Sequence, residues 1–312
     1  MSSAIDRFQQ RYSRRRDRSD STAQTYARRL NLFRDWLKED RGKEIEEATT
    51  EDVRDHLDWL HSEGYAEDSL KGSRSAISQY WQVMDVDGDN PVDGIVESWT
   101  TKSDKEKATR EKRYYLTREQ VADLIENVPE PTTRNEIVVK LLYQTGCRRS
   151  ELATIRVEDV DREGRTITVW DEKDDEPRVV AYQPSLDTPL SVWLDVKRPQ
   201  VHGAGESPYL LPTRQSEHIS GETIRKVVKT AAENAGIQDS YGEDAKGRER
   251  ALITPHVLRH THAVHAAENG IPAPHLKQTL GHTKIDVTQI YLEIAQDDAV
   301  EMLKDRGPSL EL

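Results

Sequence analysis

A charged segment without apolar periodicity interrupts this sequence after its first hundred residues. The segment, TTKSDKEKATREKR at residues 100–113, has no apolar face that could pack against a core. Polar, charged stretches of this kind connect domains, so we predict a linker at residues 101–113. The flanking parts, residues 1–100 and 114–312, are each long enough to bury a core of their own.

The first part, residues 1–100, has the apolar spacing of amphipathic helices. Between residues 21 and 38, apolar side chains recur at intervals of three and four, which places them on one helix face. Thr50 is of a residue type that caps helices, and it predicts a helix to about residue 62. A further helix is expected at residues 67–84. We therefore predict a small helical domain.

The second part combines helical patterns with one pair of strand patterns. The runs TITVW and RVVAY are rich in β-branched residues, and the acidic loop DEKDDEP joins them as in a hairpin. Pro255 follows Thr254, an N-cap residue type, and starts a helix that Gly270 ends. The chain is therefore predicted to be mainly α with a small β-hairpin or sheet, an α+β fold. The helices expected in this part are 117–127, 133–143, a short one from 150, 185–196, 220–235, 255–270, 272–280 and 285–295.

The composition is acidic and strongly polar. The formal net charge is −12, 33% of the residues are charged, and the mean hydropathy is −0.83. Apolar periodicity along most of the chain argues against disorder. We interpret the acidity as a solvated surface of the halophilic kind, found in organisms that keep high internal salt. By itself, an acidic net charge argues against nucleic acid as a partner.

The sequence predicts a cytoplasmic protein. Cys147 is the single cysteine, so no internal disulfide can form and a reducing compartment is natural. The N-terminal residues lack the apolar segment of a secretory signal. No run of about 18 apolar residues occurs that could span a membrane.

Basic residues gather in the N-terminal arm. Residues 1–42 carry eleven Lys and Arg against six Asp and Glu, whereas residues 43–100 carry four against fifteen. A basic arm beside an acidic block indicates that the arm has a role of its own.

The segment TPHVLRHTHAVH contains four of the ten histidines of the chain. On a helix, His256 and His260 share a face and Arg259 lies between them, whereas His262 and His265 point elsewhere and are interpreted as structural. A guanidinium stays charged and repels a metal ion, and the glutamate of a zinc-protease helix is missing, so no metal site is predicted. Histidine and arginine on one face suit an anion such as phosphate.

Two other segments carry residues that suit the same anion. In TGCRRSEL, Arg148 follows a turn and Glu151 lies three residues later, where its carboxylate can pair with the arginine. In LGHTKIDVTQIYLEI, His282 follows a helix-breaking glycine, and Tyr291 lies nine residues further on. Taken singly, these segments also fit a surface turn and a buried helix face.

In this order and at these separations, the three motifs resemble those of the tyrosine recombinases, also called phage integrases. The likeness is greatest to the Xer-like and archaeal integrase-like members. The matched motifs are TGCRRSEL, PHVLRHTHA and LGH followed by the tyrosine. The resemblance covers essentially the whole chain. It implies a helical, SAM-like core-binding domain at residues 1–100 and a catalytic domain with a C-terminal tail at residues 114–312.

The resemblance also implies which residues form the site. Lys173 is the only lysine of the hairpin turn DEKDDEP and takes the place of the family's hairpin lysine, although the glycines of the family turn are missing. The implied catalytic residues are Arg148, Lys173, His256, Arg259, His282 and Tyr291, with Glu151 and His260 in supporting positions.

The implied chemistry is phosphoryl transfer from DNA to a tyrosine. Tyr291 would attack the scissile phosphate and form a covalent 3′-phosphotyrosine. His256 would act as general base and Lys173 as general acid. Arg148 and Arg259 would supply the positive charge that a metal ion supplies in many nucleases. The bond energy is conserved, so neither a metal, nor ATP, nor another cofactor is expected.

The implied partner is double-stranded DNA at a specific recombination site in the nucleoid. A homotetramer is expected on DNA, whereas the free protein can be a monomer. Three alternatives stay open: a non-cleaving DNA-binding accessory protein of the same fold, a type IB topoisomerase-like relaxing enzyme, and a metal-dependent hydrolase built on the histidine helix. Because the chain as a whole is acidic, the binding of DNA requires a local basic surface on the protein. The residues selected for it are Arg14, Arg15, Arg16, Arg18, Arg28 and Arg29.

Overall fold

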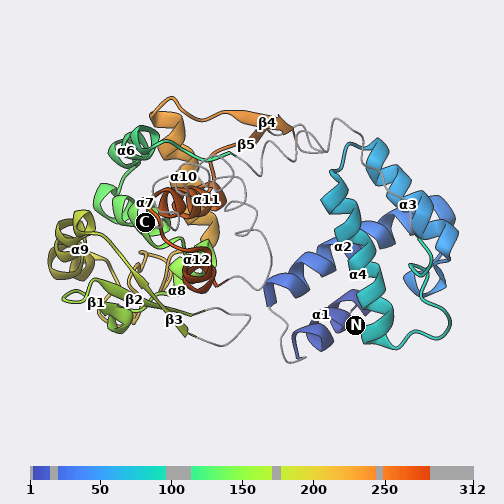
Figure 1. The fold of residues 1–312 in the computed structure, drawn as a ribbon. Coiled ribbons are helices and arrows are strands. Elements are labelled where there is room, and N and C mark those ends of the chain that lie inside the picture. The colour runs from blue at the N-terminus through green and yellow to red at the C-terminus, as the bar shows by residue number, and fades with distance from the viewer. Residues whose placement is uncertain (1–2, 15–19, 96–113, 171–176, 244–248, 282–312) are drawn as a thin grey trace, which may run out of the picture. The chain divides into compact units, whose positions relative to one another are not determined.

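The computed structural model describes residues 3–14, 20–95, 114–170, 177–243 and 249–281 (Figure 1). The chain divides into two compact units: residues 1–110 with 240–250, and residues 111–239 with 251–312. The exact ends assigned above to the linker at residues 101–113, and to the domains on either side of it, stay a prediction.

Within residues 3–14 and 20–95 of the first unit, the regular elements are all helical. They are α1 (Ala4–Ser13), α2 (Asp20–Arg41), the 3-10 turn η1 (Ile45–Glu47), α3 (Thr50–Ser62) and α4 (Glu67–Met84). The cap of α3 is Thr49 and not the predicted Thr50. The Thr49 hydroxyl accepts from the Asp52 N–H at 3.3 Å, and the Asp52 carboxylate accepts from the Thr49 N–H at 2.8 Å. This reciprocal pair satisfies two main-chain donors at the helix start, which Thr50 could not do from inside the helix.

Aromatic rings fill part of the core of the first unit and enclose His56. The His56 ring centroid lies 4.9 Å from that of Phe33, 5.1 Å from that of Trp36 and 5.6 Å from that of Trp59. The residue is 0% exposed, and within the described part of the chain neither ring nitrogen has a hydrogen-bond partner. Burial lowers the pKa of His56 to about 3, so the ring is neutral at pH 7.

Replacing His56 with phenylalanine is expected to reduce the acid sensitivity of the first unit. The unfolded chain takes up a proton at an ordinary histidine pKa of about 6.5, whereas the folded ring stays neutral down to about pH 3. The free energy of unfolding therefore falls as the pH drops through this window, by about 1.4 kcal/mol per pH unit. Urea unfolding at several pH values measures this slope. His61→Phe on the exposed side of α3 is the control, and a His56→Phe slope equal to that of the wild type would contradict the prediction.

The second unit contains most of the helices that the structure describes. The helical elements are α6 (Arg118–Glu126), α7 (Thr132–Thr145), α8 (Arg149–Thr154), η2 (Val157–Asp159), η3 (Pro184–Leu186), α9 (Asp187–Val192), η4 (Trp193–Lys197), η5 (Arg198–Gln200), α10 (Gly221–Asn234), α11 (Pro255–Glu268) and α12 (Ala273–Leu280). The unit is built around α7, which contacts α6, α8, α9, α10 and α11.

Two helices predicted for this unit have a different outcome. The helix predicted at 185–196 is divided into η3, α9 and the π-helical turn η4. The helix predicted at 285–295 lies outside the described residues.

The predicted hairpin is confirmed and belongs to an antiparallel sheet of order β1-β2-β3. Its strands are β1 (Val160–Asp161), β2 (Thr166–Trp170) and β3 (Pro177–Ala181). In the register, Val169 pairs with Arg178 and Ile167 with Val180. A second, two-stranded sheet of β4 (Ser240–Glu243) and β5 (Glu249–Ala251) was not predicted.

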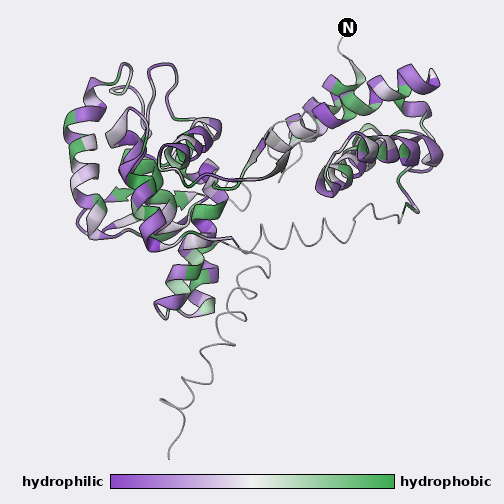
Figure 2. Ribbon diagram, turned by 90° about the horizontal axis from the view of Figure 1, so that it is seen from above, coloured by the Kyte–Doolittle hydropathy of each residue, from purple (hydrophilic) through white to green (hydrophobic). Residues whose placement is uncertain are grey.

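Burial explains why these elements pack together. Hydrophobic residues gather in the interior of the second unit, and hydrophilic residues colour much of its outer helices (Figure 2). The core includes Leu142 of α7, Leu152 of α8, Val180 of β3 and Leu258 of α11, all at most 2% exposed. Of the predicted site residues that the structure describes, Arg148 lies at the start of α8 and Arg259 lies within α11. Of the helices that the structure describes, none is long and apolar enough to cross a membrane.

Candidate active site

The segment TGCRRSEL forms the turn between α7 and α8. Helix α7 ends at Gly146, whose φ of 63° is left-handed and therefore favours glycine. A Cβ at this position would lie 2.6 Å from the His262 ring and 2.6 Å from the Leu280 side chain. Glycine thus lets α11 and α12 approach the turn that carries Arg148.

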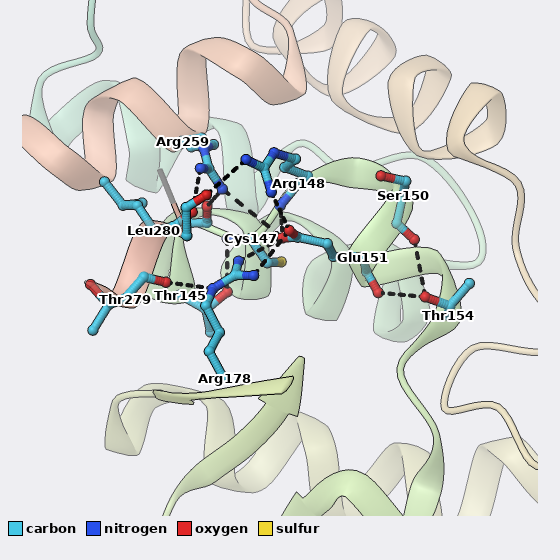
Figure 3. A network of polar contacts seen from close by, with 12 residues as sticks. Thr145, Cys147, Arg148, Ser150, Glu151, Thr154, Arg178, Arg259, Thr279 and Leu280 are labelled. Atoms are coloured by element: carbon cyan, nitrogen blue, oxygen red, sulfur yellow. Dashed lines mark hydrogen bonds and ion pairs between the residues drawn. The ribbon is translucent and has the colours of Figure 1, made fainter. Parts of the chain in front are cut away.

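Glu151 lies in the first turn of α8 and holds Arg148 in two ways. Its Oε2 accepts from the main-chain N–H of Arg148 at 2.6 Å, and its Oε1 accepts from Arg148 Nη1 at 2.7 Å (Figure 3). The Glu151 side chain is 2% exposed, whereas that of Arg148 is 35% exposed. The predicted pairing of the two residues is confirmed, and it orients a guanidinium that solvent can still reach.

Arg178 of β3 is the site residue that the sequence reasoning missed. Its Nη1 and Nη2 donate to the two carboxylate oxygens of Glu151 at 3.0 and 2.7 Å, and its Nε donates to the Thr279 carbonyl at 2.7 Å. A signal for it exists in the sequence, because Arg178 lies two residues before the buried Val180 and shares its strand face. An arginine on the buried face of a strand needs an anionic partner.

Arg259 reaches the same place from α11. Its Nη1 donates to the Gly146 carbonyl at 2.7 Å, and its Nη2 donates to the Leu280 carbonyl at 2.5 Å. The Arg259 Nη1 also lies 4.0 Å from Glu151 Oε2. The buried carboxylate of Glu151 is therefore shared by three guanidinium groups, those of Arg148, Arg178 and Arg259 (Figure 3).

Two members of this cluster, Glu151 and Arg259, have shifted pKa values and are both charged near pH 7. Burial raises the pKa of Glu151, but hydrogen bonds from Arg178 and Arg148 outweigh it, and the pKa lies below its usual value. Burial, followed by the neighbouring charge of Arg148, lowers the pKa of Arg259 to about 10. Three positive charges thus face one negative charge, and the excess suits an anionic ligand such as phosphate.

The four histidines of α11 lie in different surroundings. His256 is exposed in the first turn, and His260 is half-buried. His262 Nδ1 lies 2.8 Å from the Tyr143 carbonyl oxygen, and His265 Nδ1 lies 2.9 Å from the Tyr143 hydroxyl. Burial lowers the pKa of His262 to about 4. The structural interpretation of His262 and His265 is confirmed, and the roles of His256 and His260 stay predictions.

Several predicted site residues lie outside the described residues. These are Lys173, His282 and Tyr291 of the catalytic set, and Arg15, Arg16 and Arg18 of the basic arm. Within the described ranges, no group of three or more His, Cys, Asp or Glu side chains is placed to hold a metal ion.

The other arginines selected for DNA binding differ in exposure. Arg14, at the end of α1, and Arg28 of α2 are exposed. Arg29 is half-buried, and its guanidinium lies so close to α4 that a Cβ at Gly72 would overlap it. Glycine at this position is what allows the two helices to enclose the arginine. Arg29 therefore packs within the first unit, and a contact with DNA stays a prediction for all three.

Two family profiles match the chain. The profile described as "Phage integrase, N-terminal SAM-like domain" matches residues 5–84, and the profile described as "Phage integrase family" matches residues 114–297. The chain belongs to the phage integrase family. The family predicted from the three motifs is thus confirmed. So are the mainly helical fold with a small sheet, and the activity of a site-specific recombinase that cleaves and rejoins DNA through a tyrosine.

Recombinases are found among the curated relatives of this phage integrase family member. Tyrosine recombinase XerD of Rhizobium meliloti (strain 1021) is 26% identical to it over 97% of this chain and 94% of the relative. Tyrosine recombinase XerA of Pyrococcus furiosus is 32% identical over 57% of each chain. The likeness to XerD extends over both units.

Solved structures share the fold of this family member. A lambda integrase dimer bound to a COC′ core site has a TM-score of 0.65 at 17% identity, over 100% of this chain and 98% of the other. XerH site-specific recombinase bound to difH substrate has a TM-score of 0.66 at 17% identity, over 96% and 84%.

Proposed function

We propose that this chain holds one scissile DNA phosphate with Arg148 and Arg259 of the guanidinium cluster at the end of α12. The observation that carries the proposal is the convergence of Arg148, Arg178 and Arg259 on the buried Glu151. His282 follows the last residue of this arrangement, Gly281, directly in the sequence. The residues proposed to act on the phosphate are Arg148, Lys173, His256, Arg259, His282 and Tyr291.

The proposed reaction forms one bond to phosphorus, breaks another and transfers two protons. The Tyr291 oxygen forms a bond to phosphorus while the bond from phosphorus to the DNA 5′-oxygen breaks. His256 accepts the tyrosine proton, and Lys173 donates a proton to the leaving 5′-oxygen. His282 donates a hydrogen bond to a non-bridging oxygen. The 5′-hydroxyl of another strand reverses the step, so no external energy source is required.

The arginines stabilise the charge that develops on the phosphate. A tyrosine hydroxyl has an ordinary pKa of about 10, so it is a poor nucleophile at neutral pH without help. Fixed guanidinium groups in a partly buried site act more strongly than they would in water, and they need no reorganisation during the reaction. The Arg148 side chain is more exposed than that of Arg259, and we assign it the first contact with DNA.

A local basic site can bind DNA although the net charge is −12. Phosphate neutralisation dominates DNA affinity, so the arginine cluster and the N-terminal arm would act where DNA lies, within an acidic surface suited to high salt. A lambda integrase tetramer has been solved on a Holliday junction. By analogy we propose a homotetramer on two duplexes, in the cytoplasm at the nucleoid.

The test does not require the DNA site to be known. The protein is incubated in EDTA with a pool of nicked suicide duplexes whose central sequence is randomised, and covalent adducts are isolated under denaturing conditions. Because a nicked duplex loses its 5′-hydroxyl fragment after cleavage, the adduct accumulates. We expect adducts with an enriched sequence, and peptide mass spectrometry is expected to locate the nucleotide on Tyr291.

The control is Tyr291→Phe, which should form no adduct on the enriched duplex. Absence of a wild-type adduct, or attachment to another residue, would contradict the proposal. Dependence on an added metal ion would favour the hydrolase alternative. Relaxation of supercoiled DNA without exchange between duplexes would favour the topoisomerase alternative.

A further inference from the structure

Three consecutive main-chain carbonyls at the end of α12 each accept a hydrogen bond from a different arginine. Arg178 Nε donates to Thr279, Arg259 Nη2 to Leu280, and Arg148 Nη2 to Gly281, at 2.7, 2.5 and 3.0 Å. The last carbonyls of a helix lack partners within the helix, and positive charge is favourable there. The arginines therefore fix the position of the α12 end as well as that of Glu151 (Figure 3).

Arg178 differs from Arg148 and Arg259 in how far its guanidinium is available to a ligand. All three of its nitrogens donate to protein acceptors, two to Glu151 and one to Thr279. Its side chain is 12% exposed, against 35% for Arg148. A Cβ at Gly281 would lie 3.1 Å from Arg178 Nη1, so the guanidinium also packs closely against this glycine.

We propose that Arg178 is a positioning residue that sets the Arg148 guanidinium through Glu151 and sets the end of α12 through Thr279. The proposal rests on the proposed function, in which Arg148 binds the scissile phosphate. Arg178 itself does not touch DNA. Its bidentate contact holds the carboxylate plane of Glu151 in one orientation, and this orientation determines where Arg148 Nη1 finds its acceptor.

The charges around Glu151 explain what the loss of Arg178 would do. The groups that face this carboxylate are the guanidiniums of Arg148, Arg178 and Arg259 and the buried Cys147 thiol. Without Arg178, one carboxylate oxygen loses its shortest side-chain donor, and Arg259 Nη1 at 4.0 Å is the nearest replacement. Glu151 would then either take up a proton or draw Arg259 away from Leu280, and both changes misplace a phosphate-binding group.

The experiment compares Arg178→Gln, Arg178→Lys and the control Arg162→Gln, whose exposed ion pair with Asp195 lies elsewhere in the second unit. The duplex enriched from the randomised pool is the DNA probe. We expect Arg178→Gln to slow adduct formation by about 10- to 100-fold, the range found when a residue that orients a metal ligand is replaced. The Kd for the same duplex should change less than about threefold, since Arg178 makes no DNA contact. Arg178→Lys should restore part of the rate.

A pH profile separates positioning from a general loss of structure. In Arg178→Gln the pKa of Glu151 rises, so the rate of adduct formation should fall further at about pH 5.5 than at about pH 8. The ratio of the wild-type rates at these two pH values should stay closer to one. A rate equal to that of Arg162→Gln would overturn the proposal. So would equal losses in Kd and rate with a wild-type pH profile.

A measurement on the protein alone distinguishes this proposal from the proposed function. The difference in free energy of unfolding between wild type and Arg178→Gln should be largest near pH 7. It should shrink as the pH falls, because Glu151 becomes protonated in the variant before it does in the wild type. In a Glu151→Gln background the difference should not depend on pH. If wild type forms no adduct, the proposed function fails, yet this pH dependence would still support the link from Arg178 to Glu151, and its absence would overturn the link.

Discussion

Replacing Arg259 with methionine is expected to slow covalent adduct formation by about 10³-fold or more, the range measured when an arginine that stabilises a phosphoryl transition state is removed. Methionine has a similar length and no charge. Its side chain would leave the Gly146 and Leu280 carbonyls without the donors that Arg259 supplies. Both the charge on the phosphate and the end of α12 are therefore affected. Single-turnover adduct formation on the enriched duplex measures the rate.

Arg259→Lys is the matched variant for this prediction. Lysine keeps the charge but cannot donate to two carbonyls from a planar fork, so we expect an intermediate rate. Thermal unfolding of each variant reports how far the fold is affected. Adduct formation by Arg259→Met within tenfold of the wild-type rate would refute the assignment of Arg259 to the phosphate.

Replacing Glu151 with glutamine is expected to lower the free energy of unfolding of the second unit by about 3–5 kcal/mol, the cost of breaking a buried ion pair by removing one partner. The carboxylate is 2% exposed, and its loss leaves the guanidiniums of Arg148, Arg178 and Arg259 close together without a counter-charge. Native-state hydrogen exchange of α7 and α11 measures the effect, because a chain with two units need not unfold in one step.

The pH dependence of this effect has a defined sign. Because the folded-state pKa of Glu151 is lowered, its contribution is present above the ordinary carboxyl pKa and is lost as the pH falls below it. The penalty of Glu151→Gln should therefore be smaller in acid than at pH 7. Glu222→Gln removes an exposed partner of Arg225 and should cost less than about 1 kcal/mol. A similar loss of unfolding free energy in both variants would show that the buried ion pairs of Glu151 stabilise the fold no more than an exposed pair does.

Much of the helical architecture follows from local signals. Ser220 caps α10, and its hydroxyl accepts from the Thr223 N–H at 3.1 Å. Gly281 ends α12 with a φ of 62°. Such caps involve residues within one turn of each other, so the sequence displays them directly. Helix α1 and the β4–β5 sheet were missed, because short elements have a weak period and depend on their neighbours.

The pairing of Arg148 with Glu151 could also be predicted, since the two residues are three positions apart at a helix start. The contacts of Arg178 could not be. Its partner Glu151 is 27 residues away and its partner Thr279 is 101 residues away. Strand alternation indicates that Arg178 faces the core, but no local pattern indicates which anion meets it there.

The sequence by itself determined the family, the division into two parts and the pairing of Arg148 with Glu151. These properties depend on the order and spacing of motifs and on periodicities within single elements. Only the tertiary structure decided that one buried carboxylate serves three arginines and that these arginines hold three successive carbonyls of α12. The physical reason is that a buried charge must find its partners wherever packing brings them, at separations along the chain that no local pattern records.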